Sequence, residues 1–444
     1  MRVRQKIDRA VHANERDGMH IPNHTVVFDR LKRHTDGPPH SINAKLVEMY
    51  LRAAAVCAAL LFSQVLQAET ILILPFFNHS SSVGLDWIGE SISEQVRDSL
   101  VAENLLVLDR EDRLEAYRRL SLRPGAELTH ASIIKLAQTL DADTVLFGTY
   151  QLFPPASGKD QSKGTLRITA RMIDLKKLSE GAEFSELGAI EELVALEVHL
   201  GWQTLSRLNP GHMPTEQQFL HARPAVRLDA VESYIRGLVA ANAEERRRYF
   251  SKAARLDEHY SQPRFQLGKA AWESKDYHTA AEWLEHVDRS DPHYYEAQFR
   301  LGLCRYYSGD FAAAEQSFQT VVSAFPLNEV YNDLAAAQSR RNNIAAAVAN
   351  YQKALEGDSS DPDYHFNLGY VYWRDGKFSE AAASFRNALE RNPGDAEATL
   401  LLGRALKQEG PRPGDTRLEA RERIKIDYQE TAYRQLKAEL QAKH

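Results

Sequence analysis

The stretch DPDYHFNLGYVYWRDGKFSEAAASFRNALERNP, residues 361–393, decides the fold of this chain. It belongs to a pattern that returns about every 34 residues through the second half of the sequence. Small residues set the period, at Gly268, Gly302, Ala335, Gly369 and Gly403. An alanine follows twelve positions later and a large residue after four more, as in Ala280 with Leu284, Ala314 with Phe318, Ala347 with Tyr351 and Ala381 with Phe385. This period predicts stacked pairs of antiparallel helices, with each small residue allowing close helix contact and each large residue filling the gap to the next unit.

The offsets within this pattern resemble the tetratricopeptide repeat. In residues 361–393 they are carried by Leu368-Gly369, Tyr372, Ala381, Phe385, Ala388 and Pro393. The resemblance covers about residues 229–410, with a short first unit at Gly237 and only the first helix of a last unit at Gly403. It implies an all-α solenoid that binds other proteins and does no chemistry.

The end of such an array needs a cap, because no unit buries its own apolar face. Residues 411–444 are expected to supply it as one long helix over 416–442. Thr416 can cap this helix, and an apolar stripe recurs at every fourth position. The stripe consists of Ile424, Tyr428, Ala432, Leu436 and Leu440.

In the resembled family the first helix of each unit lines a concave groove. Carrying those positions over predicts an open, aromatic groove edged with Arg and Lys, suited to an extended or helical peptide with acidic groups. The predicted partner-binding residues are Phe265, Lys269, Trp272, Phe299, Tyr306, Tyr307, Arg340, Phe366, Tyr370, Trp373, Arg374 and Arg404, with Asn332 and Lys407 on the same face. The alternative is that the rings only pack across the inner face. A clamp for C-terminal carboxylates is not expected, since phenylalanines occupy one of its polar positions.

Residues 69–208 are expected to form a small α/β sandwich with a mixed sheet. The run TILILPFF at 70–77 predicts a buried strand, and an amphipathic helix follows from Trp87 to Leu100. Further strands are expected at 105–108, 143–152, 165–175 and 183–189, and further helices at 110–120, 129–140 and 191–208. Residues 209–228, which contain three prolines, are expected to be a linker.

This region resembles the N-terminal domain family of TolB-type translocation proteins. Related domains occur in flagellar- and curli-type outer-membrane assembly proteins. The resemblance is carried by Ile73-Leu74-Pro75-Phe76 with Asn78, by Ile88-Gly89-Glu90, by Val107-Leu108-Asp109-Arg110, and by residues 140–150 and 166–174. The TolB propeller repeats are absent. The resemblance therefore implies a looser class that joins this domain to tetratricopeptide arrays.

The N-terminal region has the layout of an exported protein. Arg52, a short apolar run and Ala68 predict a signal peptide over residues 49–68, with Met49 as the start. Residues 1–48 are then a mis-assigned start or a disordered leader, whose histidines lack the spacing of a metal site. The alternatives are an uncleaved anchor, a lipoprotein signal at Cys57, or a buried helix of a cytoplasmic protein.

The sequence contains no pattern typical of catalysis or cofactor binding. It lacks a glycine-rich phosphate loop, a zinc-protease motif and paired metal-binding cysteines. The net charge of −6 gives no electrostatic case for nucleic acid. We therefore expect a non-enzymatic, exported adaptor without cofactors, acting in cell-envelope assembly or transport. The alternative is a cytoplasmic or membrane-anchored signalling scaffold that uses the same repeats.

Overall fold

The computed structural model describes residues 69–80, 84–155, 163–211, 213–223, 225–412, 420–429, 432, 433 and 436. The leader predicted at 1–48 and the signal segment predicted at 49–68 lie outside these residues. The described residues all belong to one compact unit, Ala68–His444. Within them, no helix combines the length and the apolar character needed to cross a bilayer.

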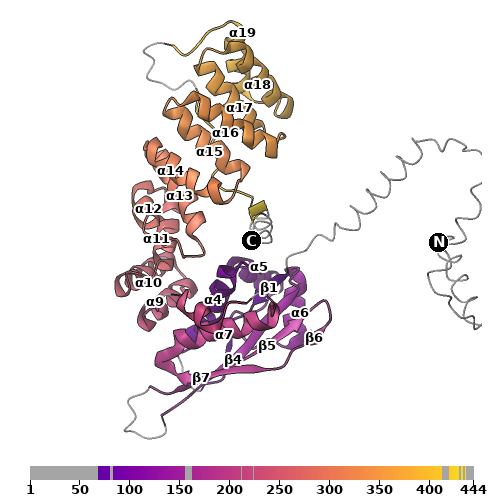
Figure 1. Cartoon of the computed structure of the whole chain (residues 1–444), viewed down its shortest axis with the longest axis vertical. Coiled ribbons are helices and arrows are strands. Elements are labelled where there is room, and N and C mark those ends of the chain that lie inside the picture. The colour runs from indigo at the N-terminus through magenta and orange to yellow at the C-terminus, as the bar shows by residue number, and fades with distance from the viewer. Residues whose placement is uncertain are drawn as a thin grey trace, which may run out of the picture. The chain divides into compact units, whose positions relative to one another are not determined.

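A mixed sheet forms the centre of the first part of this unit (Figure 1). Three strands pair in parallel in the order β3-β1-β4, and β5 then pairs antiparallel with β4. β2 extends the parallel pairing along β4, while β6 and β7 both pair antiparallel with β5. The strands are β1 Thr70–Ile73, β2 Phe77–Asn78, β3 Leu106–Val107, β4 Thr144–Phe153, β5 Thr165–Asp174, β6 Ser179–Glu180 and β7 Phe184–Ala189.

Strand β1 shows why helices cover both faces of the sheet. Side chains alternate along β1 and the residue that follows it, so that Ile71 and Ile73 enter one apolar core while Leu72 and Leu74 belong to another. The first core includes residues of α4 (Trp87–Ala102) and α7 (Leu193–Leu208), and the second includes residues of α5 (Arg110–Arg119) and α6 (His130–Thr139). The predicted α/β sandwich with a mixed sheet is confirmed.

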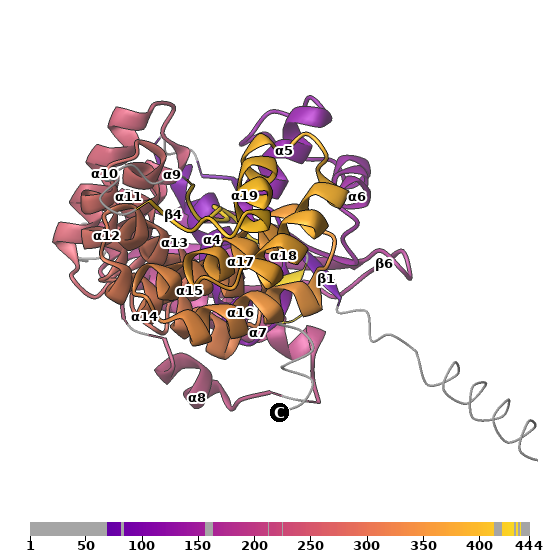
Figure 2. The same ribbon diagram turned by 90° about the horizontal axis from the view of Figure 1, so that it is seen from above.

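Helix pairs form the rest of the unit and follow one another in chain order (Figure 1, Figure 2). Each pair lies where the sequence period places it, including the short first unit. The helices are α9 Leu228–Val239, α10 Ala243–Leu256, α11 Gln262–Glu273, α12 Tyr277–Leu284, α13 Tyr294–Tyr307, α14 Phe311–Ala324, α15 Asn328–Arg340, α16 Ile344–Gly357, α17 Pro362–Arg374, α18 Phe378–Arg391 and α19 Ala396–Leu406.

The small and large residues of the repeat contact each other inside a single unit. A Cβ added to Gly302 would lie 2.6 Å from the ring of Phe318, and one added to Gly369 would lie 2.9 Å from Phe385. The glycine therefore makes room for the ring of its own helix pair. The ring also belongs to an apolar cluster with residues of the next unit, as Phe318 does with Val330 and Phe385 with Leu401, in line with the expectation that it fills the gap between units.

The predicted linker 209–228 contains a packed helix, α8 (Glu216–His221). Thr215 and Gln218 form a capping box at its start, and Phe219 is fully buried. Residues of the α/β part and of the first repeat also share one apolar core, which contains both Val96 of α4 and Tyr234 of α9. The linker prediction is therefore wrong for this helix, because an apolar side chain inside it anchors it to the core.

The predicted C-terminal capping helix is also wrong over residues 420–429, which carry no helix. These residues lie against the inner side of the repeats, where side chains of the array bind the backbone groups that a helix would pair internally. Ile424 and Tyr428 do pack on an apolar core, but on the one formed by α13, α14 and α15. The remaining residues of the predicted helix are described only in part.

Candidate functional site

The inner groove of the repeats holds residues 420–429, which we call the C-terminal segment. Four consecutive first helices, α13, α15, α17 and α19, supply its neighbours, together with the residues that cap α17 and α19. The first helices recur on one side because each unit repeats the same hairpin geometry. The groove that the sequence predicts is therefore present, but it is filled by the chain itself.

A buried carboxylate lies at the centre of this contact. The side chain of Glu422 is fully buried and accepts hydrogen bonds from Ser339 Oγ at 2.9 Å and from the Tyr306 hydroxyl at 3.3 Å. Arg340 Nε lies 2.7 Å from one carboxylate oxygen, and Arg374 donates to the other at 3.3 Å. Two cations and two hydroxyls thus compensate for the removal of this charge from water.

Two asparagines bind the main chain of the segment beside this carboxylate. Asn367 accepts a hydrogen bond from the Arg423 amide at 2.8 Å and donates one to the Arg423 carbonyl at 2.9 Å. Asn332 donates a second bond to the same carbonyl at 2.9 Å. The Tyr370 hydroxyl donates to the Ala420 carbonyl at 2.8 Å. We call Asn332 and Asn367 the asparagine pair; they bind backbone and so fix the register of the segment.

Acidic residues hold the two basic side chains that follow Glu422. The Arg423 guanidinium binds both oxygens of Asp395, at 2.6 and 2.9 Å, and reaches Asp363 at 3.2 Å. Lys425 Nζ lies 2.7 Å from Asp363 and 2.8 Å from Asp361. Burial alone would lower the pKa of Lys425, but its bonds to the two aspartates raise that pKa.

The far end of the segment is aromatic. Tyr428 makes an edge contact with Phe299, with ring centres 5.3 Å apart. Beyond the segment, Tyr433 makes a similar contact with Phe325 at 4.8 Å. The segment is thus held by charge at one end and by rings at the other.

Comparison with known families identifies the helical region. Models of the tetratricopeptide repeat match residues 271–337, 340–376 and 369–410. Residues 271–410 thus contain tetratricopeptide repeats. These matches do not extend into the α/β part, and no curated protein matches the chain.

Solved structures similar to the tetratricopeptide array include MamA, residues 41 to the end, from Desulfovibrio magneticus RS-1. It is 24% identical, covers 39% of this chain and 99% of its own, and has a TM-score of 0.34. Another is YrrB, described as a TPR protein with an unusual peptide-binding site. It is 18% identical, covers 38% of this chain and 84% of its own, and has a TM-score of 0.32.

The structure places half of the predicted groove residues of the tetratricopeptide array against the C-terminal segment. Arg340 and Arg374 pair with its carboxylate, and the remaining contacts come from hydroxyls and ring faces. Those contacts are made by Phe299, Tyr306, Phe366 and Tyr370. The expectation of an open groove is wrong, because complementary charges draw residues 420–429 into it.

The other predicted groove residues contact different parts of the chain. Trp373 donates to the Glu409 carbonyl at 2.7 Å, and Arg404 lies over its ring at 4.9 Å. Phe265 stacks on His293 with ring centres 4.6 Å apart. Trp272 is grouped with Tyr277 and the half-exposed Tyr307, while Lys269 lines a cavity that Tyr428 also lines.

Several of the predicted rings are core residues. Phe366 and Trp373 are 0% and 1% exposed and belong to the same apolar cluster as Phe385 and Leu401. They contribute at least as much to the stability of the array as to the groove. The expectation that they act mainly as surface anchors is therefore not supported by their burial.

Sequence reasoning missed the polar residues that bind the segment most directly. These are Asn367, Ser339, Asp333, Asp363, Asp395 and Asp361. Two features of the sequence point to them. Asn332, Asp333 and Asn367 interrupt the apolar face of a first helix, and the order Glu422-Arg423-x-Lys425 is complementary to the charges of the groove.

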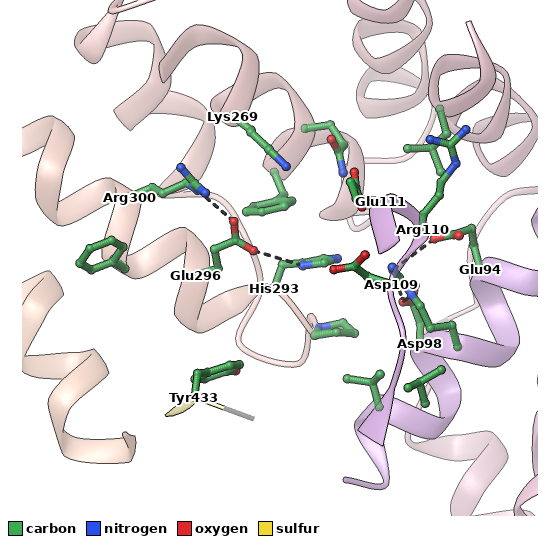
Figure 3. A pocket seen from close by; sticks show the side chains of 18 of the residues that line it. Glu94, Asp98, Asp109, Arg110, Glu111, Lys269, His293, Glu296, Arg300 and Tyr433 are labelled. Carbon is green, nitrogen blue, oxygen red and sulfur yellow. Dashed lines mark hydrogen bonds and ion pairs between the residues drawn. The ribbon is translucent and has the colours of Figure 1, made fainter. Parts of the chain in front are cut away.

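A hollow of about 320 Å³ adjoins the aromatic end of the groove, since Phe299, Tyr428 and Tyr433 line it together with residues of α4, α5, α11 and α13 (Figure 3). Glu296 lies between Arg300, at 2.9 Å, and His293, at 3.7 Å. Burial alone would lower the pKa of His293, but its bond to Glu296 and the charge of Asp291 raise that pKa. Acidic and basic side chains mix around this hollow, so it shows no preference for a ligand of one charge.

The described residues contain no group of three or more metal-binding side chains. Cys304 is buried in α13, and burial raises the pKa of its thiol to about 12, which leaves it protonated and unreactive. It packs as a small apolar group, as its place in the repeat predicts.

Proposed function

We propose that this chain is a non-enzymatic adaptor that binds an extended segment of a protein partner in the inner groove of its tetratricopeptide array. The observation that carries the proposal is the seating of the C-terminal segment. Asn367 bonds both the amide and the carbonyl of one residue, and such main-chain bonding serves any extended peptide. The same bonds are available to the main chain of a partner's segment.

The groove also has the energetic features of a binding site. Its buried ion pairs and aromatic contacts lie on helices whose main chain is already ordered by helix pairing, so little backbone ordering cost falls on the array when a peptide binds. The rings of Phe299 and Phe325 offer apolar contact at one end. A partner peptide can contact the ion-pairing residues and these rings at the same time.

We further propose that the adaptor is exported and serves cell-envelope assembly or transport. The layout of residues 49–68 and the resemblance of residues 69–208 to the TolB N-terminal family support this. Fusing a reporter enzyme after residue 68 tests it. Reporter activity confined to the periplasm is expected, and activity confined to the cytoplasm would favour the signalling scaffold instead.

Selection from a library of random peptides tests the groove. The bait is the full chain carrying Glu422→Gln, Arg423→Ala and Lys425→Ala, which we call the released variant. We expect enrichment of peptides that no longer bind when Asn332→Ala and Asn367→Ala are added. Failure to enrich any peptide that depends on the asparagine pair would reject the proposed function.

A further inference from the structure

We propose that the C-terminal segment is an internal competitor, and that the partner displacing it carries the same order of charges. That order is a carboxylate, a guanidinium at the next position, and an amine two positions later, in an extended peptide. This inference rests on the proposed function and adds to it the chemistry of the partner and a closed state of the adaptor.

The carboxylate requirement follows from two arginines. Arg340 and Arg374 converge on Glu422, whose side chain is fully buried, while their own side chains are only 14% and 25% exposed. A peptide that displaced Glu422 without a carboxylate of its own would leave two largely buried cations facing each other. Uncompensated buried charge is strongly unfavourable, so the displacing peptide must bring an acid to this position.

The requirement for cations follows from aspartates that are fixed before any peptide arrives. Asp395 caps α19 by accepting from the Ala398 amide at 3.0 Å, and Asp361 caps α17 by accepting from the Asp363 amide at 2.8 Å. Helix capping holds these carboxylates in place. They present a preformed acidic site for Arg423 and Lys425, and a guanidinium suits the two-oxygen contact better than an amine does.

The spacing of the charges follows from the asparagine pair. Because Asn367 binds both backbone groups of Arg423, it holds the main chain at one point and so fixes where the side chains before and after that point are presented. Neighbouring side chains of an extended peptide point to opposite sides. The side chain of residue 422 is thereby directed to the two arginines, and the side chain of residue 423 is directed to the aspartates. Arg421 and Ile426 are exposed, so those two positions carry no requirement.

The segment also has a strong competitive advantage. It is part of the chain that it binds, so a partner must overcome an effective concentration on the order of millimolar. A short peptide with the same contacts therefore binds the intact chain weakly. A partner succeeds by matching the charge order and adding contacts elsewhere.

The test uses a fluorescent peptide with the sequence of residues 420–429, ARERIKIDYQ. Its affinity is measured for the intact chain, for the released variant, and for Arg421→Ala as a matched control. We expect at least tenfold tighter binding to the released variant than to the intact chain or the control. Equal affinity for all three would overturn the internal competitor.

A second peptide with the charges exchanged, ARKEIEIDYQ, tests the charge order. It should bind the released variant at least tenfold more weakly than the first peptide. Equal binding of the two peptides would reject the charge requirement, although a groove that binds other library peptides would still satisfy the proposed function. If neither the two designed peptides nor any library peptide bound the released variant, both the charge requirement and the proposed function would be rejected.

Folding of the variants is checked by circular dichroism and thermal unfolding. If the released variant does not fold, the single substitution Glu422→Gln replaces it, since it keeps the shape of the side chain and removes only the charge. We then expect about a threefold or larger gain in affinity for the first peptide over the intact chain. No gain with a folded Glu422→Gln chain would count against the proposal.

Discussion

The guanidinium carbon of Arg423 lies 3.6 Å from the centre of the Phe366 ring. The ring is completely buried in the array, and the cation belongs to the segment in the groove. One face of Phe366 thus supports the core while the other carries the ligand-like segment. The stability of the array and the occupancy of its groove are therefore linked at this residue.

Replacing Arg423 should lower the stability of the whole chain. Arg423→Ala removes the paired bonds to Asp395 and the cation–π contact, and leaves acidic groups without their partner. We expect a loss of about 1–3 kcal/mol in the free energy of unfolding, measured by urea denaturation. Arg423→Lys should recover only part of this, because an amine cannot make the two-oxygen contact. A chain as stable as the exposed control Arg421→Ala would contradict the expectation.

Removing the large buried rings of α17 should destabilise the array. Phe366→Ala and Trp373→Ala each delete a buried side chain, which costs about 3–5 kcal/mol. Thermal unfolding monitored by circular dichroism would show a fall of several degrees. The same substitution at Tyr307, which is 44% exposed, is the control and should have a much smaller effect. An unchanged unfolding temperature for Phe366→Ala would show that the ring is a surface anchor after all.

The close contact inside each helix pair makes a further prediction. Gly302→Ala places a methyl group against Phe318 and should cost about 1–3 kcal/mol through overpacking. Gly403→Ala is the matched control, because a Cβ there meets nothing within 4 Å and alanine favours a helix. Differential scanning calorimetry should show opposite shifts for the two variants. Equal shifts would mean that the glycines serve only backbone conformation.

The stability of the chain should fall as pH rises from about 4.5 to about 8 because of Glu197. This side chain is fully buried in α7, and burial raises its pKa from 4.5 to about 8, although the neighbouring Ser91 hydroxyl lowers that pKa in part. Between these values the folded state keeps a proton that the unfolded chain releases. The contribution of Glu197 to the free energy of unfolding is therefore fully present below pH 4.5. It is lost as pH rises through 8, by on the order of 4 kcal/mol.

Glu197→Gln provides the control for this pH dependence. It keeps the neutral shape and should flatten the dependence between those two values, so that the variant is more stable than the parent at pH 8. Urea midpoints at several pH values measure this. Parallel curves for the two chains would show that the carboxyl group is not the source.

The sequence predicts the helix pairs and the sheet well because both depend on local patterns. The period of glycines fixes where each hairpin turns, and TILI at 70–73 has the apolar character of a strand buried on both faces. These signals act over a few residues or over one repeat. They remain visible without any knowledge of distant contacts.

The path of the C-terminal segment could not be predicted in the same way. Ile424 and Tyr428 have helical spacing, and that spacing also suits an extended segment whose apolar side chains contact one core. The choice between a helix and an extended segment depends on the match of Glu422 and Arg423 to partners between 26 and 116 residues away in the chain. A single sequence shows the charges but not which ones meet.

The position of Phe366 was ambiguous for a related reason. A residue on the inner side of a first helix can face a ligand, the neighbouring unit or both. The repeat pattern gives the side of the helix and not the depth of burial. Only the packing of Phe385 and Leu401 around it shows that the ring is core.

The core shared by α4 and α9 determines how this protein can be divided for experiments. Val231, Tyr234 and Ile235 of α9 are at most 3% exposed, in the same cluster as Val96 and Leu100 of α4. A fragment cut at residue 229 would present those apolar side chains to solvent. Such a fragment would be prone to self-association and would adhere to many proteins. Genuine ligands should therefore be sought with chains that retain the α/β part.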